Sequence, residues 1–115
     1  MPLVKWTLVN QVPYGLPKKM TVQELQDLIC RVCKVEWSSL LVKNRDPKLV
    51  QARILYSYFR KRRFNNSLKD IGAVFNQDHS TIIHSIKCVT EHMQSKDPAW
   101  DQFKEYYTEI HSTIY

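Results

Sequence analysis

The fold is decided by the stretch Ile71-Gly72-Ala73-Val74-Phe75-Asn76-Gln77-Asp78-His79-Ser80-Thr81-Ile82-Ile83-His84-Ser85-Ile86. In it, an apolar segment ends at a short polar break, and a new helix then opens with four polar side chains. A helix-turn-helix presents its recognition helix in this way, because the first turn reaches base edges while later apolar positions anchor the helix to the domain. The stretch therefore predicts a helix-turn-helix whose second helix starts at Asp78.

Helix-start signals divide the rest of the chain. Thr21 and Glu24 form a capping-box pattern ahead of an apolar stripe, and Asp46-Pro47 places a good cap before a proline suited to the first helical position. The predicted helical segments are 21–34, 37–42 (opened by Ser38 or Ser39), 46–63, 67–75, one starting at Asp78 and one starting at Asp97. We expect an all-α, compact helical domain of about six such segments over residues 21–115, preceded by an N-terminal extension over residues 1–20.

The charge of the chain is concentrated in its middle. Nine cationic side chains and one acid lie between Lys43 and Lys69, a net charge of +8, whereas the remaining residues carry −2 of the total of +6. A segment of one sign beside a helix-turn-helix favours a polyanionic partner and indicates phosphate contacts. For any one of these cations, the alternative that it is only part of a solvated charged surface remains open.

The first turn of the predicted recognition helix carries side chains suited to reading bases. The Asp78 carboxylate can accept from the cytosine amino group, and Thr81 can offer its methyl group to thymine and its hydroxyl to phosphate. His79 can donate to an exposed base edge or pack against it. Such residues also make ordinary capped helix starts, so their position next to the basic segment is what favours double-stranded DNA as the partner.

The order Asp78-His79-Ser80-Thr81, followed by Ile82-Ile83-His84-Ser85, resembles the signature of the C-terminal DNA-binding domain of DnaA, the bacterial replication initiator. The resemblance extends from about Thr21 to Ile110. It implies a DnaA C-terminal, Trp-repressor-like fold in which Asp78, His79, Ser80 and Thr81 lie in the major groove. It also implies a bacterial, cytoplasmic and nucleoid-associated protein that binds replication-origin or regulatory sites, together with replication or regulatory proteins.

This chain departs from the family pattern at two places. The family has Gly-Gly-Arg before the aspartate, whereas here Asn76-Gln77 makes the turn one residue shorter. Arginine reads guanine and glutamine suits adenine, so we expect Gln77 to read a base and to shift the target sequence. Pro47 stands where the family has an arginine that enters the minor groove.

Five further residues are predicted to position the DNA through its backbone or minor groove. Lys43 and Arg45 align with the basic loop of the family, and Arg53 aligns with a family arginine that approaches the DNA. The full predicted set is Lys43, Arg45, Lys48, Arg53 and Lys69.

Other functions find little support in the sequence. No apolar run is long enough to span a membrane, and no secretory signal peptide is recognised. Cys30 and Cys33 have no second pair at zinc spacing, so we expect neither a metal site nor a cofactor. Gly15 and Gly72 are the two glycines, and no phosphate-binding loop is possible, so we expect a stand-alone domain without nucleotide binding, ATPase activity or other catalysis.

One alternative of a different class remains open. The chain could be a helical protein-interaction module that keeps the fold and has lost specific DNA reading. The shortened turn, Gln77 and Pro47 are the features that favour it, with residues 1–20 as its docking arm. Salt-dependent binding to duplex DNA would separate the two interpretations.

Overall fold

Six α-helices and one short 3-10 helix make up residues 20–115, the part of the chain that this computed structural model describes. The predicted extension over residues 1–20 lies outside the described residues, apart from Met20. The elements are α1 (Val22–Cys33), α2 (Trp37–Leu41), α3 (Pro47–Phe64), α4 (Leu68–Phe75), α5 (His79–Gln94), η1 (Pro98–Trp100) and α6 (Asp101–Ile114). The prediction of an all-α domain containing a helix-turn-helix is confirmed for these residues.

Most of the helix starts follow from their capping residues. The Thr21 hydroxyl accepts from the Glu24 backbone N–H, and the Glu24 carboxylate accepts from the Thr21 N–H in return. Ser67 accepts from the Asp70 N–H at 3.1 Å. Side-chain caps of this kind satisfy backbone donors that have no partner inside the helix, which is why these positions could be predicted.

Two helix starts differ from the prediction. Helix α2 begins at Trp37 after Glu36, without a side-chain cap, so the expectation that Ser38 or Ser39 opens it is wrong. Asp97 does accept from the Ala99 N–H, but the turn that follows is the 3-10 helix η1, and α6 begins at Asp101.

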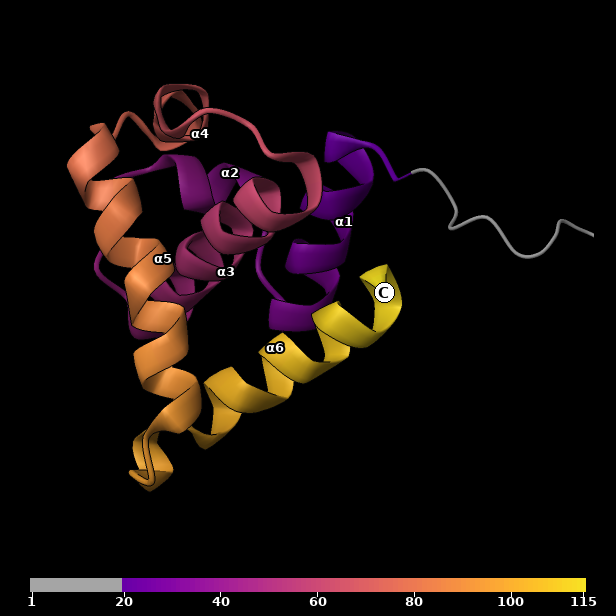
Figure 1. The fold of residues 1–115 in the computed structure, drawn as a ribbon, viewed down its shortest axis with the longest axis vertical. Coiled ribbons are helices and arrows are strands. Elements are labelled where there is room, and N and C mark those ends of the chain that lie inside the picture. The colour runs from indigo at the N-terminus through magenta and orange to yellow at the C-terminus, as the bar shows by residue number, and fades with distance from the viewer. Residues whose placement is uncertain (1–19) are drawn as a thin grey trace, which may run out of the picture.

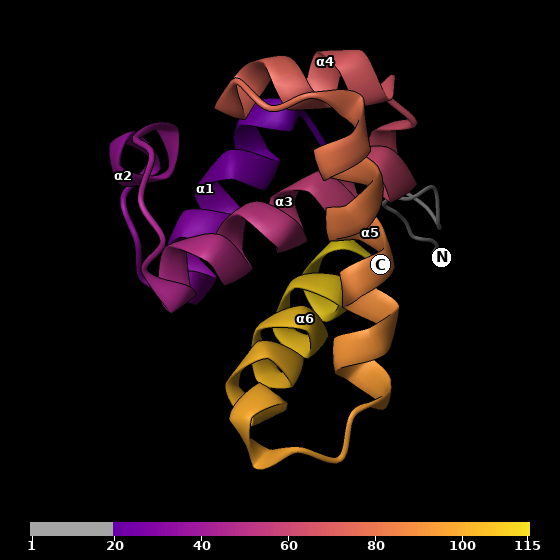
Figure 2. The same ribbon diagram turned by 90° about the vertical axis from the view of Figure 1, so that its left-hand side faces the viewer.

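The core is built around α3, which crosses the middle of the bundle. Tyr56 and Phe59 of α3 are fully buried, and Leu25, Ile29 and Phe103 from neighbouring helices close over them. In Figure 1, α4 lies above α3, α5 descends at one side, and α6 returns so that its C-terminal end lies beside α1. Figure 2 shows α2 set to the side of the bundle away from α5.

The sequence contains no apolar run long enough to span a membrane, and the helices of the structure can be compared with that observation. Among the described residues, no helix combines the length and the apolar character that crossing a bilayer requires.

Candidate nucleic-acid interface

The first turn of α5 is exposed, while the residues that follow anchor the helix in the core. Asp78 caps the helix by accepting from the Thr81 N–H at 2.9 Å, and the four residues 78–81 are exposed. Ile82 is fully buried, and Val89 two turns later is also buried. The predicted cap at Asp78 is confirmed. Buried residues hold the helix in the domain, while its N-terminal turn is exposed to solvent.

The turn between α4 and α5 is short because Gly72 permits close contact. Asn76 adopts the left-handed conformation with φ of 54°, and the Gln77 N–H donates to the Gly72 carbonyl at 2.8 Å. A Cβ on Gly72 would meet the Gln77 carbonyl oxygen well inside van der Waals contact. Gly72 is therefore required by the packing of this turn.

An aromatic cluster fixes the end of α4. The Phe75 ring lies 5.7 Å from the ring of Trp37 in α2 and 5.4 Å from the ring of Tyr56 in α3, measured between centroids. Since Asn76 and Gln77 follow directly, this cluster sets where Gln77 lies relative to the segment after α2.

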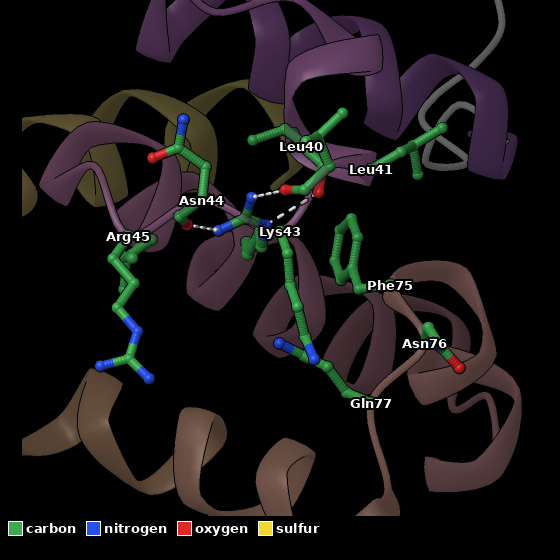
Figure 3. Close-up of a pocket in the computed structure, with 11 residues that line it drawn as sticks. Leu40, Leu41, Lys43, Asn44, Arg45, Phe75, Asn76 and Gln77 are labelled. Carbon is green, nitrogen blue, oxygen red and sulfur yellow. Dashed lines mark hydrogen bonds between the residues drawn. The ribbon is translucent and has the colours of Figure 1, made fainter.

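That segment, the α2–α3 loop (residues 42–46), faces the α4–α5 turn across an open hollow of about 720 Å³. Lys43 and Arg45 of the loop and Gln77 of the turn all line the hollow. In Figure 3 the Lys43 and Arg45 side chains extend away from Leu40 and Leu41. The fold therefore brings together Lys43 and Arg45, which are predicted to contact the DNA backbone, and Gln77, which is predicted to read a base.

Two other predicted cations lie outside the lining of this hollow. Lys48 is exposed in the first turn of α3, and Lys69 is exposed in the first turn of α4. Both side chains are accessible, and each lies next to an element of the site: Lys48 follows the α2–α3 loop, and Lys69 belongs to the first helix of the helix-turn-helix.

Arg53 differs from the other predicted cations, because its guanidinium is turned into the protein. Its Nε donates to the Leu40 carbonyl at 2.8 Å, and its two terminal nitrogens donate to the carbonyls of Asn44 at 2.8 Å and Val42 at 2.6 Å (Figure 3). A longer bond of 3.5 Å reaches the Ser39 carbonyl. Burial lowers the pKa of this guanidinium below its usual value.

The basic run Arg60–Arg63 lies at the opposite end of α3 from the loop. Arg60 donates to the Asn66 side chain at 2.7 Å and to the Tyr56 hydroxyl at 3.1 Å, and Lys61 donates to the Asn66 carbonyl at 3.3 Å. These bonds hold the α3–α4 turn. Arg62 is exposed, and its guanidinium lies 5.6 Å from the centre of the Tyr58 ring.

Sequence reasoning missed the part that Asn44 plays in the loop. Its side-chain oxygen accepts from the Asp46 N–H at 2.8 Å, while Asp46 in turn accepts from the Lys48 N–H at 3.0 Å. Asparagine commonly bonds to the backbone two residues ahead. The spacing Asn44-x-Asp46-Pro47 was therefore a signal that could have been used.

The cysteines are packing residues in this structure. Cys33 and Cys88 are buried, Cys30 is half-buried, and burial raises the pKa of Cys33 to about 12. A thiol with so high a pKa is a poor nucleophile and metal ligand at neutral pH. Across residues 20–115, no group of three or more His, Cys, Asp or Glu side chains is arranged to hold a metal ion.

Comparison with known proteins agrees with this geometry. The sequence pattern of the family described as bacterial dnaA protein helix-turn-helix matches residues 22–89. The chromosomal replication initiator protein DnaA of Methylacidiphilum infernorum is 31% identical over 93 residues, which cover 80% of this chain and 20% of that protein. The protein of the same name from Porphyromonas gingivalis is 31% identical over 88 residues, covering 76% and 19%. The chain thus spans about a fifth of the length of these curated relatives.

Proposed function

Because the chain belongs to the bacterial DnaA helix-turn-helix family, we propose that it binds double-stranded DNA sequence-specifically through α4 and α5. The observation that carries the proposal is the exposed, capped first turn of α5 above the buried anchor Ile82. The major groove admits an α-helix and displays a distinct pattern of donors and acceptors for each base pair. The residues proposed to read bases are Gln77, Asp78, His79, Ser80 and Thr81.

The exposed cations supply the part of the affinity that does not depend on sequence. Lys43, Arg45, Lys48 and Lys69 are proposed to contact phosphates, and Lys43 and Arg45 share a hollow with Gln77. Each phosphate contact releases counterions, so four contacts predict that log K falls by about three to four units per tenfold rise in salt. Such contacts position the protein without selecting a sequence.

The proposed setting is the bacterial nucleoid, at replication origins or regulatory sites. The relatives named above are chromosomal replication initiators, and this chain matches about a fifth of their length. The 115 residues contain no phosphate-binding loop, so we propose that they bind initiator-type sites without nucleotide or catalysis, alone or with replication or regulatory proteins. Mapping of bound chromosomal DNA should show enrichment at origins or promoters, and a uniform distribution would contradict this role.

The test of sequence-specific binding is selection of bound duplexes from a random pool, followed by affinity measurement at several salt concentrations. We expect an enriched motif, a steep salt dependence and loss of the motif in a recognition-helix variant. Retention of all sequences alike, with a steep salt dependence, would restrict the function to non-specific binding.

One observation favours the second candidate, a protein-interaction module. Leu41 is 50% exposed and Val42 is 62% exposed, beside the same hollow. Exposed apolar side chains that lie together are a feature of protein-binding surfaces. Failure to bind duplex DNA at low salt would favour this candidate over the first.

A further inference from the structure

Three carbonyl groups converge on one side chain beneath the candidate interface. Leu40, Val42 and Asn44 each accept from the guanidinium of Arg53, at 2.8, 2.6 and 2.8 Å. The residues lie at alternate positions along the chain, from the last turn of α2 into the α2–α3 loop. One rigid group therefore sets the path of the backbone on both sides of Lys43.

The loop has few other means of holding this shape. Residues 41–48 are all exposed, so no buried side chain of the loop anchors it. Besides the bonds from Arg53, the loop has those from the Asp46 N–H to the Asn44 side chain, from the Lys48 N–H to the Asp46 side chain and from the Val50 N–H to the Asp46 carbonyl. These bonds fix the start of α3, whereas those from Arg53 connect the loop to the body of that helix.

The same contacts take up most of the donors of Arg53. A guanidinium has five N–H groups in a fixed planar fork. Four of them point at the carbonyls of Ser39, Leu40, Val42 and Asn44. A phosphate contact of the ordinary bidentate kind needs two free donors on one edge, so it would have to break bonds that hold the loop.

We propose that Arg53 is a positioning residue, which holds the α2–α3 loop so that Lys43 and Arg45 meet the DNA backbone beside Gln77. The proposal rests on the proposed DNA-binding function and replaces the expectation that Arg53 contacts DNA itself. Lysine cannot take over this role, since an ammonium on a flexible stem cannot span three carbonyls in one plane. The shape of the loop therefore depends on the planar set of N–H donors of the Arg53 guanidinium, and not on its positive charge.

The first test compares duplex affinity over a range of salt for wild type, Arg53→Ala, Arg53→Lys, the pair Lys43→Ala/Arg45→Ala, and the pair combined with Arg53→Ala. We expect both Arg53 variants to lower the salt slope nearly as much as the pair does, by about two units. Adding Arg53→Ala to the pair should change affinity less than twofold. Full rescue by Arg53→Lys, or a further loss of about one slope unit in the combined variant, would establish a direct phosphate contact and overturn the proposal.

The second test needs no DNA. Amide hydrogen exchange should become faster at Asp46 and Lys48 in Arg53→Lys, while the Thr81 amide in the first turn of α5 exchanges as in wild type. Unchanged exchange at Asp46 and Lys48 would show that Arg53 does not hold the loop. If wild type itself fails to bind duplex DNA, the proposed function fails, and the exchange measurement still decides whether Arg53 orders this loop.

Discussion

A single carboxylate oxygen of Asp78 accepts two hydrogen bonds from Thr81, one from its backbone N–H at 2.9 Å and one from its hydroxyl at 3.0 Å. These bonds from Thr81 are the main reason that the pKa of Asp78 lies below its usual value. Asp78 and Thr81, both predicted to read bases, are thus hydrogen-bonded to each other in the protein without DNA. The group that starts the recognition helix and the group proposed to read a base are the same side chain.

This double role of Asp78 predicts that stability and specificity can be separated. Asp78→Ala removes the cap and should cost about 1 kcal/mol of unfolding free energy, in addition to any loss of base preference. Asp78→Ser keeps a capping oxygen but lacks the carboxylate that would accept from a cytosine amino group. Because serine and aspartate cap helices about equally well, its stability should stay within about 0.5 kcal/mol of wild type. Urea unfolding of the two variants measures the difference.

Both variants should relax the preference at one base pair by about 1–3 kcal/mol in competition binding with duplexes that differ at that position. The serine variant is the matched control, since it separates reading from folding. If Asp78→Ser selected the same motif as wild type with equal discrimination, Asp78 would be a cap alone, and the base would have to be read by its neighbours.

Gln77 gives a prediction about which base is read. Its side chain lines the hollow opposite Lys43, just before the recognition helix. Glutamine pairs with adenine and arginine with guanine in the major groove, so Gln77→Arg should change the preferred base at one position from adenine to guanine. Duplex selection with the variant measures this. Because arginine also adds a charge, a uniform gain for all duplexes without a change of motif would mean that residue 77 contacts phosphate.

Gly72→Ala should distort the turn that sets the angle of α5. In an exposed helix this substitution stabilises by up to about 1 kcal/mol, because alanine is the better helix former. Here the added methyl group would meet the Gln77 carbonyl, so we expect a net destabilisation of about 1–3 kcal/mol. Ala73→Gly, at an exposed position of the same helix, is the control and should cost about 1 kcal/mol. A Gly72→Ala protein more stable than wild type would show that the Gln77 carbonyl can move away from the added methyl group at little cost in free energy.

The contrast between the α5 start and Arg53 shows which parts of the site the sequence could predict. Caps at Thr21, Ser67 and Asp78 act over three residues, so the local sequence contains both partners of each bond. Arg53 bonds to carbonyls 9 to 14 residues away. Because every residue has a backbone carbonyl, the sequence does not indicate which of them a side chain will bind. Alignment with a family arginine predicted contact with DNA, and it gave no indication that the guanidinium donates to the carbonyls of Leu40, Val42 and Asn44. The uncapped start of α2 escaped prediction for a related reason, because its position depends on the packing of Trp37 against Tyr56 and Phe75.

The junction between α5 and η1 contains a titratable group in an aromatic contact. The His92 imidazole stacks on the Trp100 ring with centroids 3.5 Å apart, and Phe103 meets it edge-on at 5.1 Å. Burial is the main cause that lowers the pKa of His92; nearby Glu91 opposes the shift, and His84 adds to it. The neutral imidazole is therefore the form that fits this junction.

Stability should consequently fall when His92 becomes protonated. Because its folded-state pKa lies below the unfolded value of 6.5, the unfolded chain binds more protons as the pH drops, and the contribution of His92 is present above 6.5 and lost below it. We expect the urea midpoint of wild type to decrease between pH 7 and pH 5, and to decrease less in His92→Gln, which cannot titrate. His79→Gln, at an exposed position in the first turn of α5, is the control for removing a histidine away from this junction. An equal decrease in wild type and His92→Gln would place the pH dependence elsewhere in the molecule.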